Sequence, residues 1–330
     1  MGYRVTLIES GHHFMVEGHE TILEAGLRSG IHLNYGCSSG NCGECKARLL
    51  SGEVQRQFHD FPLTEVEKME NTFLLCRSQP LTDITIAANE IHGSGDIPRQ
   101  KIITRVSKIN RHSTDLLLVE LHTPRTKLLK FLPGQHIELT FNQKIKGDLP
   151  IASCPCNGMV LQLHCMREES PFSDYLFQSM KKSERVLIRG PYGQFSLDEE
   201  LKQPIIFICE GIHFAPVKSL IEQCINLDLP QSLALFWMVS PPEEHYLNNY
   251  CRSLEVSLDN FRYHPLTLRE RHTYPEIVER IVKDLPADTP HEIYIATNSA
   301  LGDEVEAIFN KRREGFDTLK RMRRRQLPRS

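Results

Sequence analysis

Four cysteines, Cys37, Cys42, Cys45 and Cys76, constrain this chain more than any other feature of its sequence. Four residues separate the first two, two residues separate the next pair, and thirty residues precede the last. This is the spacing of the thiolate ligands that hold a [2Fe–2S] cluster. We therefore expect residues 37–45 to form a loop around two irons, with Cys76 reaching the same centre from a distant part of the chain.

The residues between the cysteines favour the same interpretation. A loop with three thiolates must wrap closely around two irons and their bridging sulfides, and Ser38, Ser39, Gly40 and Gly43 are small enough to allow it. A structural zinc site and a pair of disulfides are the alternatives. Zinc sites usually join two short Cys-x-x-Cys knuckles, whereas this chain has three close cysteines and one distant partner. The cluster is therefore favoured.

Composition indicates an ordinary globular protein of two or three domains, with 330 residues, 40% hydrophobic, 25% charged and a formal net charge of −3. No apolar run approaches the ~18 residues that cross a bilayer, and the N-terminus lacks the apolar core of a signal peptide. The other six cysteines lie in apolar segments, which fits free thiols in a reducing compartment. We therefore expect a cytoplasmic protein, and we interpret Cys154 and Cys156 as packing residues rather than a disulfide.

The first 92 residues have the pattern of one small domain. Apolar and polar residues alternate near the N-terminus, which predicts a hairpin. Two capping boxes, Thr21 with Glu24 and Thr64 with Glu67, predict helices that begin there. Together with the cysteines, this segment resembles a plant-type ferredoxin of β-grasp fold. The resemblance implies that all four cysteines are cluster ligands.

The rest of the chain changes pattern twice. Residues 93–100 have no periodicity, and we interpret them as a linker. Short apolar strands separated by turns fill residues 101–199, which predicts a small antiparallel barrel. Residues 200–316 alternate apolar strands with helices, one of them near residues 274–282, which predicts a parallel sheet covered on both faces.

The C-terminal end is basic: residues 311–330 hold nine Lys or Arg and two acidic residues. We interpret residues 317–330 as a solvated tail, in preference to a segment that docks on an acidic partner or a membrane surface. Nothing in the sequence favours a nucleic-acid partner.

A small barrel and a parallel α/β sheet placed after a ferredoxin domain resemble the ferredoxin-NADP reductase-like family. The domain order is similar to that of the reductases of hexulose dehydratase systems and of bacterial oxygenases. The resemblance implies a multidomain α+β and α/β protein: a β-grasp [2Fe–2S] domain, an FAD-binding-type barrel and an NAD(P)-binding-type domain. It also implies that hydride passes from NADH or NADPH to FAD, and that single electrons then pass through the cluster to a protein partner.

The family's flavin motif, Arg-x-Tyr-Ser, aligns with residues 147–150, which are Gly-Asp-Leu-Pro here. Gly147 replaces the arginine that balances phosphate charge, and we expect neighbouring Lys146 to supply that charge. Leu149 replaces the tyrosine that covers the flavin ring, and Pro150 replaces the serine near flavin N5. The flavin-site candidates that the resemblance implies are Lys146, Leu149, Pro150, Ile151, His164 and Ser173, the last of these near the pyrophosphate.

The nicotinamide side also departs from the family. The family's Gly-Thr-Gly, which lets the cofactor approach the backbone, becomes Gly211-Ile212-His213. The candidates implied here are Gly211, His213, Ala215 and Pro216. A histidine in place of a glycine more often fills the vacated space and caps the helix than binds a ligand.

Three interpretations of function stay open. The first is an NAD(P)H-dependent iron–sulfur flavoprotein reductase whose electron acceptor is an oxygenase, a dehydratase or another redox enzyme. The second is a ferredoxin relay or docking protein whose reductase-like body has lost flavin or NAD(P)H binding. The third keeps the flavin but receives electrons from another protein. The first is favoured because helix N-termini and backbone amides carry much of dinucleotide binding. The sequence assigns no catalytic residue.

Overall fold

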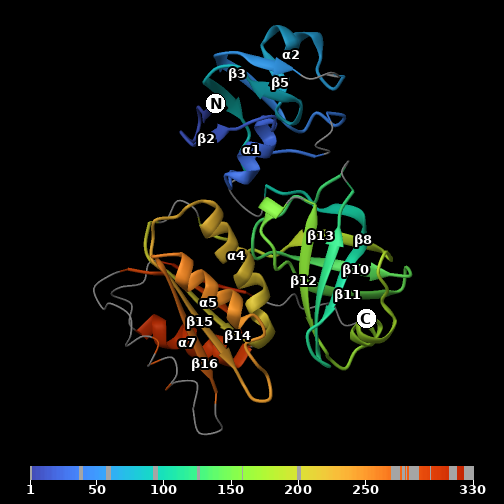
Figure 1. Ribbon diagram of the computed structural model, residues 1–330, viewed down its shortest axis with the longest axis vertical. Coiled ribbons are helices and arrows are strands. Elements are labelled where there is room, and N and C mark those ends of the chain that lie inside the picture. Colours follow the sequence, from blue (N-terminus) through green and yellow to red (C-terminus); the bar gives the residue numbers. More distant parts are fainter. Residues whose placement is uncertain are drawn as a thin grey trace.

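The computed structural model describes residues 2–36, 40–56, 61–91, 96–124, 127–157, 159–198, 202–268, 276, 279, 281, 290–297, 299–311 and 318–322. Figure 1 shows three bodies in chain order: the blue N-terminal body at the top, the green barrel at the right, and a yellow-to-red sheet with its helices at the lower left. This is the multidomain α+β and α/β architecture that the sequence predicts.

The N-terminal body is a five-stranded mixed sheet in the order β2-β1-β7-β3-β5, beside a two-stranded ribbon of β4 and β6. The strands are β1 (Tyr3–Leu7), β2 (His13–Val16), β3 (Lys46–Ser51), β4 (Val54–Arg56), β5 (Thr72–Leu74), β6 (Ser78–Pro80) and β7 (Ile84–Ala88). Helices α1 (Ile22–Arg28) and α2 (Glu65–Met69) begin after Thr21 and Thr64, and both capping boxes are formed. The predicted hairpin and both predicted helix starts are therefore confirmed.

The second body is a six-stranded antiparallel sheet in the order β11-β10-β13-β8-β9-β12. Its strands are β8 (Gln100–Arg111), β9 (Leu116–His122), β10 (His136–Phe141), β11 (Ile145–Pro150), β12 (Val160–Met166) and β13 (Arg185–Tyr192). A bridge between Ile151 and Leu163 joins the end of β11 to β12, so the sheet curls into a barrel. Helix α3 (Pro171–Asp174) continues into a π-helical turn, η3 (Tyr175–Ser179), beside β11.

The third body is a parallel sheet in the order β16-β15-β14-β17-β18. Its strands are β14 (Ile205–Glu210), β15 (Leu233–Val239), β16 (Phe261–Thr267), β17 (Glu292–Ala296) and β18 (Thr318–Arg321). The helices are η4 (Gly211–His213), α4 (Phe214–Asn226), α5 (Asn248–Ser257) and α7 (Ser299–Lys311). Central β14 is buried from Ile205 to Cys209, which explains its unbroken apolar sequence.

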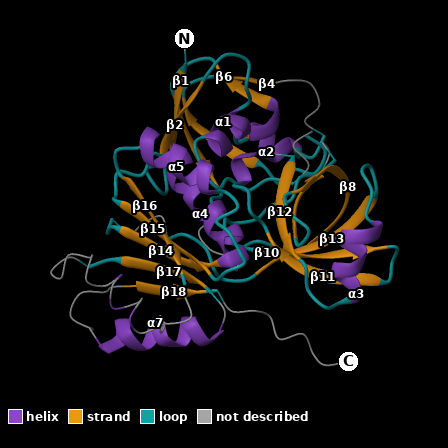
Figure 2. Ribbon diagram, turned by 60° about the horizontal axis from the view of Figure 1, so that its bottom comes forward, coloured by secondary structure: helices purple, strands orange, loops and turns teal. Residues whose placement is uncertain are grey.

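Helix α4 lies where the three bodies meet (Figure 2). Ten of its 13 residues are buried. Ser219 Oγ donates a hydrogen bond of 2.7 Å to the Ser153 carbonyl of the barrel, and Gln223 Nε2 donates one of 3.1 Å to the Gly30 carbonyl of the N-terminal body. One helix therefore makes polar contacts with both of the other bodies.

The structure changes several expectations outside the site. Strand β18 uses residues of the predicted tail, and Arg321 there pairs with Asp303 and Glu306 of α7, so the prediction of a solvated tail is wrong for residues 318–321. Cys154 and Cys156 form a disulfide across η2 (Pro155–Asn157), so the packing interpretation of this pair is wrong.

Other expectations fall partly or wholly outside the described residues. The helix predicted near residues 274–282 and the first part of the linker, at 93–95, belong to this group. Strand β16 and helix α5 were not predicted. In the part of the chain that the structure describes, no helix has both the length and the apolar composition of a membrane span.

Candidate functional site

The cysteine loop lies at the start of β3. Cys45 and Cys76 are both buried, and their sulfurs are 3.2 Å apart, whereas Cys42 is exposed. Cys37 lies outside the described residues. The structure thus brings two of the four candidate ligands together across 31 positions of the chain.

Strand register explains this meeting. Lys46 pairs with Leu74 where β3 and β5 run antiparallel, so Cys45 and the η1 turn (Leu75–Arg77) are neighbours. The Leu75 amide donates a hydrogen bond of 2.9 Å to the Cys45 carbonyl and fixes the turn that carries Cys76. Backbone pairing, and not only side-chain packing, therefore positions these two sulfurs.

The loop around Cys42 is also shaped for sulfur. A Cβ on Gly36 would lie 2.7 Å from the Cys42 sulfur, so only glycine leaves that space free. The Glu44 amide donates to the Cys42 sulfur at 3.5 Å. Hydrogen bonds of this kind stabilise negative charge on cluster sulfurs.

No three His, Cys, Asp or Glu side chains come close enough to hold one metal ion within the described ranges, which omit Cys37. In a [2Fe–2S] cluster each of the two irons binds two protein thiolates, so the site needs two pairs of cysteines rather than three ligands around one ion. The Cys45–Cys76 pair and the glycine-lined space at Cys42 fit this demand.

A second candidate site is a cavity of about 660 Å³ between the barrel and the third body. This volume is in the range of cofactor and ligand pockets. Its walls include strand β11 from Ile145, the end of β12, helix α3 and the η4 turn. Of the sequence candidates, six line it: Lys146, Leu149, Pro150, His164, Ser173 and His213. Ile151, Gly211, Ala215 and Pro216 are adjacent in the chain but do not line it.

The segment that aligns with the flavin motif forms β11, and packing explains why residue 147 is a glycine. A Cβ on Gly147 would lie 2.3 Å from the ring of Phe172, so the ring occupies the space of any side chain at this position. Lys144 and Lys146 line the cavity and supply positive charge there. Phe172 was missed by the sequence analysis because its contact with Gly147 spans two elements.

Ser173 and His164 have well-defined partners. Ser173 Oγ accepts a hydrogen bond of 2.9 Å from the Glu168 amide, and Ser170, rather than Ser173, is the N-cap of α3. His164 Nδ1 shares a hydrogen bond of 2.8 Å with the Tyr246 hydroxyl. Burial and the positive charge of Lys218 lower the pKa of His164 to about 3, so its ring is neutral.

The η4 turn is closed by side chains from β15 and the loop after it. Gly211 has φ +51°, and a Cβ there would lie 2.5 Å from Oε2 of Glu243. Burial raises the pKa of the Glu243 carboxyl. Trp237 Nε1 donates a hydrogen bond of 3.0 Å to the Gly211 carbonyl while its ring stacks on Phe214, so Trp237 is a core residue.

His213 does not cap the helix through its side chain. It is the N-cap residue of α4, but its ring nitrogen Nδ1 lies 3.1 Å from the Glu210 carbonyl and makes no capping bond. Its side chain lines the cavity. The expectation that the His213 side chain caps the helix is therefore wrong, and the expectation that it fills the vacated space stays a prediction.

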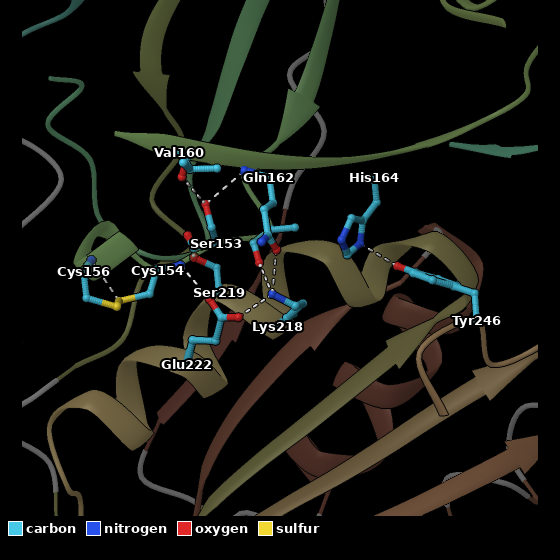
Figure 3. Close-up of polar contacts among 11 residues, drawn as sticks. Ser153, Cys154, Cys156, Val160, Gln162, His164, Lys218, Ser219, Glu222 and Tyr246 are labelled. Carbon is cyan, nitrogen blue, oxygen red and sulfur yellow. Dashed lines mark hydrogen bonds and ion pairs between the residues drawn. A yellow bond between two sulfur atoms is a disulfide. The ribbon is translucent and has the colours of Figure 1, made fainter. Parts of the chain in front are cut away.

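A polar network joins the barrel to α4 (Figure 3). Lys218 Nζ donates to the Ala152 carbonyl at 3.1 Å and to Gln162 Oε1 at 3.0 Å, and it forms an ion pair with Glu222. Glu222 Oε2 accepts the Cys154 amide at 2.8 Å. A lysine inside the apolar stripe of a buried helix was the sequence signal for this network, and the sequence analysis passed over it.

Known proteins are similar to the N-terminal body and to the chain as a whole. Residues 5–81 match the family model of the 2Fe-2S iron-sulfur cluster binding domain. Over 306 residues the chain is 29% identical to the CDP-6-deoxy-L-threo-D-glycero-4-hexulose-3-dehydrase reductase of Yersinia pestis, which covers 91% of this chain and 92% of that relative.

Solved structures share the fold. The chain matches the Amycolatopsis cytochrome P450 reductase GcoB with a TM-score of 0.60 at 22% identity, over 97% of this chain and 98% of the other. It matches phthalate dioxygenase reductase with a TM-score of 0.54 at 17% identity, over 67% and 68%. The chain therefore shares the fold of these reductases, and its first domain matches the [2Fe–2S] family. Along nearly its whole length it is similar to the hexulose-dehydrase reductase.

Proposed function

We propose that the protein is the reductase component of a redox enzyme system. It takes electrons from NADH or NADPH and passes them through FAD and a [2Fe–2S] cluster to a partner enzyme. The observation that carries this proposal is the cavity of about 660 Å³, because it gathers candidates from the barrel, α3 and η4 in one place. The name of the Yersinia relative, a dehydrase reductase, supports a protein acceptor.

The residues of the cavity fit a flavin. FAD supplies hydride acceptance and one-electron release when it is bound. Leu149, Pro150 and Leu176 offer an apolar wall for a ring system, and Lys146 offers a positive charge for a phosphate. Ser173 holds the Glu168 backbone at the cavity rim, so its role is to position the loop.

We assign the cluster to Cys37, Cys42, Cys45 and Cys76. The chain supports this assignment through the 3.2 Å approach of the Cys45 and Cys76 sulfurs and through the amide that points at Cys42. The three domains that we propose are residues 1–92, 101–199 and 200–316.

A docking protein without flavin is the weaker candidate. A body that had lost its cofactor would gain stability by filling the vacated space with apolar side chains. The cavity instead stays open and keeps Lys144 and Lys146 on its wall.

The test is the flavin and iron content of the purified protein, followed by its reduction with NADH and with NADPH. We expect one flavin and two irons. Cys76→Ser should lose iron and keep flavin, Lys146→Glu should lose flavin and keep iron, and Cys251→Ala, which changes a buried cysteine of α5, should keep both. Two irons without flavin, even after incubation with excess FAD, would leave only the ferredoxin relay.

We also propose a cytoplasmic location, because the buried thiols of Cys165, Cys209 and Cys251, which lie outside the proposed cluster, fit a reducing compartment. The basic residues after Met322 are a secondary candidate for contact with an acidic partner. Truncation of residues 323–330 tests this point: the KM for the partner should rise if they dock and stay constant if they are solvated.

A further inference from the structure

A lysine of the barrel lies against the cysteine loop of the N-terminal body. Lys130 comes from the segment before β10, yet its Nζ donates a hydrogen bond of 2.8 Å to Asn34 Oδ1 and lies 3.8 Å from Glu44 Oε2. The same ammonium lies 5.7 Å from the centre of the Tyr35 ring. All three partners belong to the segment that carries the cysteines, within three residues of Cys37, Cys42 or Cys45.

This contact is buried and firmly held. Lys130 is only 6% exposed, which is rare for a lysine. Its backbone is held on both sides by one side chain, because Gln100 Oε1 accepts the Lys130 amide at 3.0 Å and Gln100 Nε2 donates to the Lys130 carbonyl at 2.8 Å. Leu128, two residues earlier, packs on the core of the N-terminal body. The lysine therefore has a fixed place at the junction.

The charges around Lys130 do not explain its burial by themselves. Glu44 is its ion-pair partner, but that carboxylate is half exposed and 3.8 Å away, so the pair is weak. Burial lowers the pKa of Lys130, and the negative charge of Glu44 opposes this lowering. Through Asn34, Tyr35 and Glu44 the ammonium lies against the segment that carries the candidate ligands.

We propose that Lys130, a residue of the barrel, places its positive charge beside the cluster and so stabilises the reduced form of the cluster. The inference rests on the proposed function. Four thiolates, two sulfides and two ferric ions carry a total charge of −2, and one added electron makes this −3. A buried positive charge nearby favours the reduced form and raises the midpoint potential. Because Lys130 belongs to the barrel, the cluster accepts an electron more readily when the N-terminal body is docked.

Lys130 also stands on a short route between the two sites. Residue 136, at the end of the segment that begins with Lys130, lines the cavity proposed for the flavin. Gln135 fixes this segment, since its Oε1 accepts the Leu132 amide at 2.7 Å and its carbonyl accepts the Ile151 amide at 3.0 Å. The backbone that carries Lys130 therefore continues directly into the wall of the proposed flavin cavity.

The test is a potentiometric titration of the cluster, followed by electron paramagnetic resonance, in the full-length protein. Lys130→Gln should lower the midpoint potential by about 59 mV, the equivalent of a tenfold shift in a one-electron equilibrium. Lys130→Arg should keep the wild-type potential because it keeps the charge. Lys127→Gln removes an exposed lysine of the same segment and serves as the matched control with no shift.

The direction of the shift separates the electrostatic role from a structural one. If Lys130 only glued the two bodies together, its loss would expose the cluster to water, and exposure favours the more charged reduced form and raises the potential. An unchanged or raised potential in Lys130→Gln overturns the proposal. A wild-type protein that holds no iron would instead overturn the proposed function, so the two failures are distinguishable.

Discussion

The ring of His164 and the hydroxyl of Tyr246 share a hydrogen bond of 2.8 Å that joins strand β12 of the barrel to the segment before α5. The two rings meet edge to face with their centres 5.4 Å apart. Both residues are buried, and His164 itself lines the proposed flavin cavity. The hydrogen bond therefore couples the shape of that cavity to the packing of two bodies.

Acid should weaken this junction through His164. The folded-state pKa of about 3 lies below the ordinary value near 6.5, so the neutral ring stabilises the fold fully above pH 6.5. Below pH 6.5 His164 is protonated in the unfolded state but stays neutral in the folded state. The free energy of unfolding therefore falls by about 1.4 kcal/mol per pH unit. Urea unfolding measures the drop in the free energy of unfolding from pH 7.5 to pH 5.5. This drop should be about 1.4 kcal/mol larger in the wild type than in His164→Gln, which keeps a hydrogen-bonding group. Equal losses would contradict the prediction.

Lys218→Met should strongly destabilise the protein. The substitution leaves the Glu222 carboxylate, which is 19% exposed, without its cation. Breaking a fully buried pair costs about 3–5 kcal/mol, and we expect a loss toward the lower end of this range. The double variant Lys218→Met with Glu222→Gln should lose less than Lys218→Met alone, because no uncompensated charge remains. Denaturant unfolding of the two variants checks this order; a double variant that is less stable than the single one would be the contrary result.

Glu243→Gln should improve the reaction with NAD(P)H. The Glu243 carboxyl covers Gly211, where the family brings a cofactor to the backbone, and a carboxylate there repels phosphate. We expect a lower KM for the nucleotide in the variant. In the wild type the KM should fall as the pH falls, because the pKa of Glu243 is raised and protonation removes the repulsion. Steady-state kinetics with Glu244→Gln as the neighbouring control decides the matter, and identical KM values in all three proteins would count against it.

Gly147 and Phe172 should be energetically coupled. A methyl group on Gly147 would overlap the Phe172 ring, so Gly147→Ala should cost about 1–3 kcal/mol through overpacking. Phe172→Ala opens the same space, and the two substitutions together should cost less than the sum of their separate effects. A double-mutant cycle in urea measures the coupling, and strict additivity would show that the ring moves aside freely.

Regular elements were predictable where local chemistry determines them. The capping boxes of Thr21 and Thr64 predict α1 and α2, and the apolar run at residues 205–209 predicts the central strand. Strand β11 was missed as a strand because Lys146, Gly147 and Asp148 interrupt its alternation. Its pairing with β10 supplies what local propensity lacks.

The contacts that define the sites were less predictable, because they join distant residues. Lys130 lies 96 positions from Asn34, and Glu243 lies 32 positions beyond Gly211, so no periodicity connects them. One signal was available: Lys130 interrupts the apolar run of residues 128–132. A lysine in such a run must bury its charge or break the run, and here it is buried beside acceptors.

Helix α4 gives the molecule a property that no single domain has. Its first turn borders the proposed flavin cavity through His213, its middle is bonded to the barrel, and its last turns touch the N-terminal body through Gln223. A tilt of the N-terminal body therefore displaces the C-terminal end of α4, and the N-terminal end of the same helix borders the cavity. A partner that binds the cysteine loop and moves it would change the shape of the proposed flavin cavity. Binding of the electron acceptor would then be coupled to the conformation of the proposed flavin site.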